Sequence, residues 1–253
     1  MPAQRGQRVF GAGRFYGIPN ATEYGTPSPF LVTQDVSLEF KRDIKRLHGY
    51  NQIPVDVAAG MMTITGKITN AVLAARAFND LLIGGSLSTG QIPYAAEETI
   101  TITSGSTATV AVTNGAAYIQ DLGIYGATDG VPLFRVTTAS AVTADQYSVS
   151  TLGVYQFSSL SSRTSLKASY LYSTSGGQTV TMTNQPMGKT GAFEAVLGFL
   201  WGTEKSTINL PNCISSDYTF ATKLDDFMKP PFGFEAAEWT DGSLGTFSFA
   251  ELS

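Results

Sequence analysis

Few side chains in this sequence are of the types that perform nucleophilic or metal chemistry. The chain has a single histidine, His48, and a single cysteine, Cys213. His48 follows a charged segment with no patterned serine or cysteine nucleophile near it, so we interpret it as a surface or interface residue. For Cys213, a small buried side chain is the default interpretation. One cysteine and one histidine cannot build a zinc cluster or an intrachain disulfide.

Carboxylates are concentrated near the C-terminus, where Asp225 and Asp226 are followed by Glu235, Glu238 and Asp241. Two carboxyl groups about 5 to 10 Å apart could hydrolyse a glycosidic bond. Neighbouring residues of a strand point to opposite faces, however, so Asp225 and Asp226 need not share a cleft. A glycosidase that uses these acids is the third of our hypotheses, and we expect no enzymatic activity.

Two glycine-containing segments resemble parts of nucleotide-binding motifs. Residues 188–190 (GKT) end like a phosphate-binding loop, but the motif requires a glycine where Thr183 stands. Gly11 and Gly13 follow no predicted strand and lack the third glycine of a dinucleotide fingerprint. The sequence therefore predicts no catalytic residue, no metal and no cofactor.

The composition is typical of a β-rich protein that is held together by burial. Of the 253 residues, 43% are hydrophobic and only 14% are charged, which is sufficient for a core in one or two domains. No stretch approaches the roughly 18 apolar residues of a membrane span, so we expect no membrane partner.

Charge is unevenly distributed along the chain. Residues 1–46 carry seven bases and four acids, whereas residues 191–253 carry nine acids and three bases. A solvated surface would explain this pattern. Complementary charge between subunits that stack in a fixed direction would explain it as well.

The N-terminal third predicts an arm, a strand and a projection. Residues 1–29 contain four prolines and five glycines, which predicts an extended arm that lies on a neighbouring subunit or along the chain's own sheet. Residues 35–40 alternate between apolar and polar and predict a half-buried strand. Residues 41–57 predict a projecting loop or hairpin with basic residues on one limb, and Pro54 must lie at a strand end or edge.

One helix is predicted, over residues 71–83, with Asn70 as its N-cap and Gly84-Gly85 as its stop. Its apolar stripe at helical spacing consists of Ala74, Phe78, Leu81 and Leu82. From residue 92 onward, short strands separated by turn signals predict a sandwich or barrel. Within this region, residues 98–103 and 107–112 predict a hairpin around the Ser-Gly-Ser turn 104–106.

Several segments together resemble the tail tube proteins (major tail proteins) of long-tailed bacteriophages. In QDVSLEFKRDIKRLHGYNQIPVDVAAG (34–60), a strand leads to a protruding loop and a return strand, and TGKITNAVLAARAFNDLLIGGSLSTG (65–90) contains the helix. The closing strands of the family resemble GVYQFS (153–158), ASYLYSTSGGQTVTMTNQPMG (168–188) and LPNCISSDYTFATKLDDFMKPPFGFEAAEWTDGSLGTFSFAE (210–251).

The resemblance implies a mainly β fold, a β-sandwich or barrel with one flanking α-helix, that completes a shared inner β-barrel in a hexameric ring. Residues 1–29 would be the N-terminal arm and residues 30–253 the tail-tube domain, with an insertion around residues 91–130. Rings of this family stack into a hollow tube that conducts genomic DNA into the host. The implied location is the tail of the virion, after assembly in the host cytoplasm.

The implied partners are further copies of the chain, a tape-measure protein, tail terminator and baseplate or tip proteins, and DNA that passes through the lumen non-specifically. The sequence leaves open whether a sheath protein is a further partner and whether the tube belongs to a phage or to a bacteriocin-like device. We expect a net acidic lumen. The residues expected to contact the next ring are Lys41, Arg42, Lys45, Arg46, His48 and Tyr50.

The alternative from another class is a carbohydrate-binding or adhesin β-sandwich of a virion or cell surface. The chain has eleven tyrosines and two tryptophans, Trp201 and Trp239, and such rings can stack on sugars. Both tryptophans stand in strand-like contexts, where core packing is the more frequent role.

Overall fold

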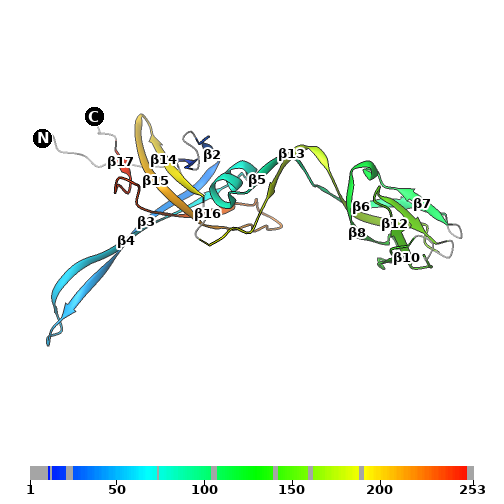
Figure 1. Cartoon of the computed structure of the whole chain (residues 1–253), viewed down its shortest axis with the longest axis horizontal. Coiled ribbons are helices and arrows are strands. Elements are labelled where there is room, and N and C mark those ends of the chain that lie inside the picture. The colour runs from blue at the N-terminus through cyan, green and yellow to red at the C-terminus, as the bar shows by residue number, and fades with distance from the viewer. Residues whose placement is uncertain are drawn as a thin grey trace. The chain divides into compact units, whose positions relative to one another are not determined.

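The structure is a computed structural model that describes residues 11, 13–20, 25–72, 74–103, 107–138, 142–158, 162–187 and 191–249. It is mainly β, with several sheets and one short helical segment (Figure 1), as the sequence predicts. The chain divides into two compact units. Unit 1 comprises Met1–Leu87 and Val180–Ser253, and unit 2 comprises Ser88–Thr179.

Unit 1 is built on one eight-stranded sheet in which every pairing is antiparallel. The order of its strands is β2-β1-β14-β15-β16-β4-β3, and β17 pairs with β15 beside this path. The strands are β1 (Arg14–Pro19), β2 (Ser28–Phe30), β3 (Thr33–His48), β4 (Pro54–Asn70), β14 (Ala192–Trp201), β15 (Glu204–Tyr218), β16 (Pro231–Ala236) and β17 (Thr246–Ser248).

One face of this sheet carries the hydrophobic core of unit 1. Side chains alternate between the two faces of a strand, and the inward members are apolar and include five phenylalanines. Gly66 of β4 is required at its position because a Cβ atom there would lie 2.1 Å from the ring of Phe234. The core consists of Phe15, Phe30, Ile64, Ile68, Ala77, Leu81, Phe193, Ala195, Leu197, Leu210, Cys213, Phe232 and Phe234.

The N-terminal segment belongs partly to this sheet. Residues 14–19 form β1, which pairs with β14 on one side and β2 on the other, and Phe15 is fully buried. Of the two locations expected for the arm, these residues therefore occupy the chain's own sheet. Residues 1–10, 12 and 21–24 lie outside the described part of the chain.

The predicted helix is shorter than expected and begins later. It consists of α1 (Ala75–Phe78), which continues into a π-helical turn, η1 (Asn79–Ile83). Asn70 as N-cap is wrong, because Asn70 still pairs with Thr33 as the last residue of β4: strand pairing outweighs the local helix signal. The stop is confirmed, since Gly84 adopts the left-handed conformation at φ +60°.

Unit 2 consists of a three-stranded sheet, β6-β12-β8, and a four-stranded sheet, β7-β11-β10-β9. Their strands enclose a second core, which includes Ile100, Tyr155, Phe157 and Tyr170. The elements are β6 (Tyr94–Thr101), β7 (Ala108–Ala111), the 3-10 turn η2 (Gly115–Ala117), β8 (Tyr118–Gly126), β9 (Phe134–Arg135), β10 (Gln146–Val149), β11 (Val154–Phe157) and β12 (Ser165–Tyr172).

The hairpin predicted over residues 98–112 is wrong. β6 pairs with β12 and β7 pairs with β11, so the two strands belong to different sheets. Ile100 and Val112 are both buried in the core between the sheets. They meet there from two different sheets and not as neighbours in one hairpin. The connecting residues 104–106 lie outside the described residues.

The ends of unit 2 are joined by a two-stranded ribbon of β5 (Ser86–Gln91) and β13 (Thr174–Thr181). The Thr179 hydroxyl donates a hydrogen bond to the Gly90 carbonyl oxygen at 2.8 Å, and the Ser88 hydroxyl donates one to the Thr179 carbonyl oxygen at 3.4 Å. The chain therefore enters and leaves unit 2 at adjacent points. This unit extends well beyond residue 130, where we expected an insertion to end.

Candidate functional site

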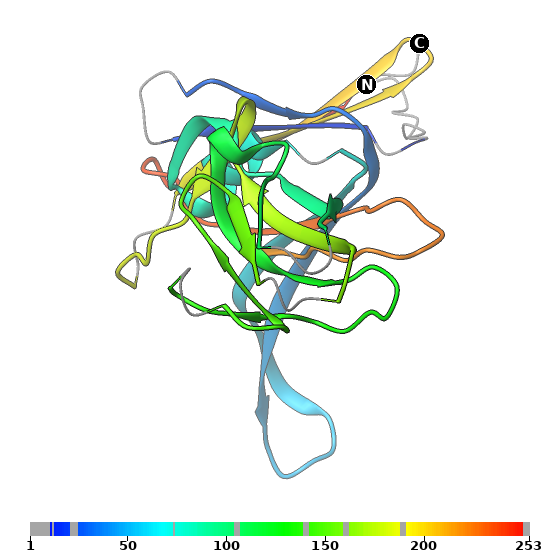
Figure 2. The same cartoon turned by 90° about the vertical axis from the view of Figure 1, so that its right-hand side faces the viewer.

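The β3–β4 hairpin projects from the sheet of unit 1 (Figures 1 and 2). The two strands pair from Thr33 opposite Asn70 to His48 opposite Pro54. The neighbouring strand β16 stops pairing with β4 at Ile64, so beyond this point β3 and β4 pair only with each other within the described chain. Every residue from 41 to 53 is exposed. The expected projection is thus a long hairpin, and Pro54 begins a strand as predicted.

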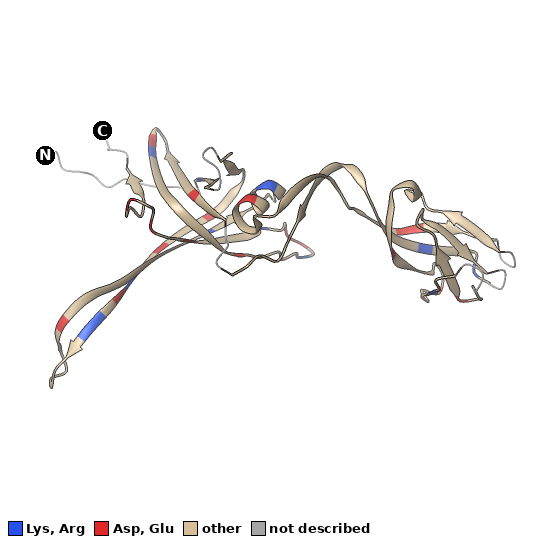
Figure 3. Ribbon diagram, viewed as in Figure 1, with Lys and Arg blue, Asp and Glu red and all other residues tan. Residues whose placement is uncertain are grey.

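The six residues expected to contact a neighbouring ring all lie on this hairpin, but the four bases do not form one cluster. Strand alternation places Lys41 and Lys45 on one face of β3 and Arg42 and Arg46 on the other. The Lys45 amine lies 3.9 Å from an Asp43 carboxylate oxygen, with both side chains mostly exposed, so this ion pair contributes little. Figure 3 shows the basic residues toward the end of the hairpin.

The Arg42 guanidinium donates a hydrogen bond to the sulfur of Met62 at 3.4 Å. His48 ends β3, and Tyr50 is fully exposed in the turn. All six side chains are therefore accessible to a partner, and their role in ring contact stays a prediction.

The sequence interpretation missed the apolar character of the hairpin. Ile53, Val55 and Met61 are 73–78% exposed. A two-stranded hairpin is at best marginally stable by itself in water, and clustered exposed apolar side chains mark interaction surfaces. The sequence predicted that residues 41–57 project but could not show that the apolar side chains of the projection lack a cover. The exposed apolar residues are Phe40, Ile44, Leu47, Tyr50, Ile53, Val55, Val57, Met61 and Met62.

The sheet face opposite the core of unit 1, here the polar face, carries mostly hydroxyl and charged side chains. Glu39 of β3 and Glu235 of β16 both stand beside Thr65 of β4 in one row across three strands. By alternation with the buried residues, the charged members of the polar face are Arg14, Asp35, Glu39, Lys41, Lys67, Glu194, Lys205, Asp217 and Glu235. Five acids against four bases give this face a slight negative charge.

The neighbouring carboxylates Asp225 and Asp226 lie outside the strands of the sheet. Both lie exposed in the connection between β15 and β16. The Lys229 amine donates hydrogen bonds to the two Asp226 oxygens at 3.0 and 3.2 Å and holds the pKa of that carboxyl below its ordinary value. No three metal-binding side chains lie together among the residues that the structure describes.

The single cysteine is in no position to act as a nucleophile. Cys213 is fully buried in the core of unit 1, and burial raises the pKa of its thiol to about 12, so the nucleophilic thiolate is absent near neutral pH. Residues 188–190 lie outside the described chain, as does the side chain of Trp201. Trp239 is 36% exposed beyond β16.

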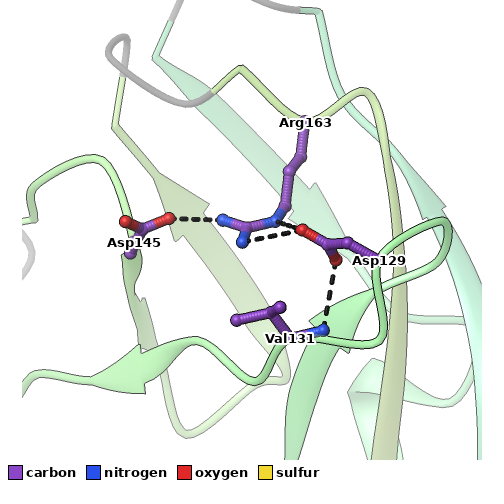
Figure 4. A network of polar contacts seen from close by, with 4 residues as sticks. All are labelled: Asp129, Val131, Asp145 and Arg163. Atoms are coloured by element: carbon purple, nitrogen blue, oxygen red, sulfur yellow. Dashed lines mark hydrogen bonds and ion pairs between the residues drawn. The ribbon is translucent and has the colours of Figure 1, made fainter.

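Unit 2 holds a polar cluster around Arg163 (Figure 4). Its guanidinium donates to one Asp129 oxygen from two nitrogens at 3.0 Å each and also bonds Asp145. The second Asp129 oxygen accepts the Val131 backbone N–H at 3.2 Å. These contacts border a pocket of about 270 Å³. Because the guanidinium already bonds two carboxylates, we interpret the cluster as a structural link between three connecting segments.

A second polar network joins the two sheets of unit 2. The hydroxyls of Tyr147 and Tyr155 donate to the two oxygens of Asp121 at 2.5 and 2.7 Å. The Tyr170 hydroxyl donates to Glu98 at 2.5 Å. The two bonds to Asp121 fix the relative position of the sheets, whereas the Tyr170 bond joins β12 to β6 within one sheet.

No protein-family model matches the chain, and no curated protein shows significant similarity to it. Among the described helical segments, none combines the length and the apolar character needed to span a membrane.

Proposed function

We propose that this chain is a structural subunit that assembles with copies of itself, and that the assembly is the tail tube that its sequence resembles. The observation that carries the proposal is the β3–β4 hairpin, with its free strand edges and exposed apolar side chains. A surface of this kind is stable in a soluble protein when another chain covers it. In the tube, six chains form each ring, and the rings stack around the path of the DNA.

The ends of the unit 1 sheet support this proposal. β2 and β3 are the terminal strands of the sheet order, so each presents an edge that no described strand of the same chain covers. Joining two different edges head to tail is a heterologous contact, which closes into a ring when the rotation between neighbours permits it. Pairing across subunits also removes edges that would otherwise invite uncontrolled association.

The chemistry of the polar face supports its proposed position along the lumen of the tube. A face with hydroxyl groups and a slight excess of acids over bases disfavours the adhesion of phosphate backbones. In this proposal the polar face lines the channel, and the core face with the short helix lies outside it. Tape-measure, terminator and baseplate proteins, and a sheath where the tail contracts, would be the partners in the virion.

Electron microscopy of the purified chain tests the proposal. We expect rings or tubes in negative stain and a concentration-dependent mass in analytical ultracentrifugation. A variant in which a two-residue Asn-Gly turn replaces residues 43–61, which keeps Arg42 opposite Met62, should stay monomeric. A control variant with Arg163→Lys in unit 2 should assemble like the unaltered chain. Compact monomers of the unaltered chain at millimolar concentration would contradict the proposal.

A further inference from the structure

Two exposed segments of unit 1 carry opposite charge. Residues 41–57 of the β3–β4 hairpin hold four bases and two acids. Residues 235–244, here the acidic segment, hold three acids and no base. Within the described chain the only ion pair of the hairpin bases is between Lys45 and Asp43. The hairpin bases and the acidic segment are therefore both available to an external partner of opposite charge.

The acidic segment has a defined shape. The Asn212 side chain donates to the Glu238 carbonyl oxygen at 2.8 Å, and the Trp239 backbone N–H donates to the Ser243 carbonyl oxygen at 2.9 Å. Hydrogen bonds from the Ser243 hydroxyl and from the Ser243 backbone N–H, the latter at 2.8 Å, hold the pKa of Asp241 below its ordinary value. This turn presents two exposed carboxylates with Trp239 between them in sequence. Neither carboxylate has an ion-pair partner among the described residues.

We propose that the arginine side of the hairpin in one copy of the chain binds the acidic segment of a second copy. Arg42 and Arg46 lie on the same face of β3 as Phe40 and Ile44, so this face offers guanidinium groups and apolar side chains together. The acidic segment offers carboxylates for charge-assisted hydrogen bonds and an indole ring for a cation–π contact. This inference rests on the proposed function and names the two surfaces that meet in it.

Another acidic candidate on unit 1 fits less well. Asp225 and Asp226 lie between Lys223 and Lys229, so their segment has no net charge, and Asp226 already bonds Lys229. A second copy could approach these residues without gaining electrostatic energy. This segment therefore supplies the matched control for the test.

The test is charge reversal with rescue, measured as the concentration at which half of the chain sediments as assembly. Arg42→Glu with Arg46→Glu should raise this concentration about tenfold or more, because like charges would then face each other. Adding Glu238→Arg and Asp241→Arg should restore assembly to within about threefold of the unaltered chain. Adding Asp225→Arg and Asp226→Arg instead changes the net charge equally and should not restore it. Circular dichroism checks that each variant is folded.

The outcomes separate this inference from the proposed function. If the unaltered chain forms no assembly, the proposed function fails and the inference fails with it. If the chain assembles but Arg42→Glu with Arg46→Glu has no effect, the inference alone is overturned. Equal rescue by the Asp225 and Asp226 changes would also overturn it, because net charge and not a specific contact would then explain the loss.

Discussion

Truncating Phe232 should destabilise unit 1 without affecting unit 2, because the two units have separate cores. Phe232 is 1% exposed. Its ring centroid lies 5.5–6.2 Å from those of five other aromatic residues, which are Phe15, Phe30, Phe193, Tyr218 and Phe234. Phe232→Ala therefore removes the centre of the cluster and leaves a cavity between the sheet strands.

The expected size of the effect follows from the burial of the ring. Phenylalanine-to-alanine changes in a packed core cost about 3–5 kcal/mol. For a unit of this size, each kcal/mol lowers the melting temperature by about 2–4 °C, so the unit 1 transition should fall by about 6–20 °C. Tyr155→Ala is the matched change in unit 2, where the side chain is fully buried and bonds Asp121.

Differential scanning calorimetry measures both transitions in one experiment. In Phe232→Ala we expect one transition to move to lower temperature while the other stays within about 1 °C, and in Tyr155→Ala we expect the reverse. A single transition that moves as a whole in both variants would refute the argument from separate cores. So would a loss of less than about 1 kcal/mol in Phe232→Ala.

Three further expectations concern individual residues. Gly66→Ala should lower the urea-unfolding free energy by about 1–3 kcal/mol, since its Cβ would overlap the Phe234 ring; unchanged stability would contradict this. The thiol of Cys213 should react with Ellman's reagent only after denaturation, and rapid reaction of the native protein at pH 8 would show that the site opens. Burial raises the pKa of Glu98, but hydrogen bonds from Tyr170 and Thr113 outweigh it and leave the pKa below its ordinary value. The ionised carboxyl thus stabilises unit 2 at neutral pH, and this stability is lost as the pH falls from about 4.5 through the lowered pKa; Tyr170→Phe should reduce the pH dependence of the calorimetric transition.

Local signals predicted those elements whose structure is decided locally. The alternation of residues 35–40, the projection predicted for residues 41–57 and the strand-end position of Pro54 led to the hairpin, and Gly84 marked the end of the helical segment. Each of these depends on backbone preferences within a few residues.

The errors concern choices that depend on distant residues. Whether Asn70 caps a helix or ends a strand is decided by β3, which pairs with it through Thr33. Whether Ile100 and Val112 lie side by side or on opposite sheets is decided by β11 and β12, more than forty residues later in the chain. The exposure of the apolar side of the hairpin was not predicted for a related reason. The sequence around Val57 alternates in the same way whether another chain covers this side or solvent surrounds it.

The pairing of β5 with β13 favours a particular order of folding. Unit 1 contains chain from both sides of unit 2, and its pairing of β1 with β14 spans the whole of it. If unit 2 folds first, the β5–β13 ribbon already brings its ends together, and the loop closed by the pairing of Pro19 with Phe193 shortens from about 170 residues to about 80. Because each doubling of loop length costs about 0.6 kcal/mol, the saving in loop-closure entropy is of that size. During synthesis, the residues of unit 2 leave the ribosome before β14, so an early-folding middle segment would act as an internal cross-link for the strands that complete the sheet.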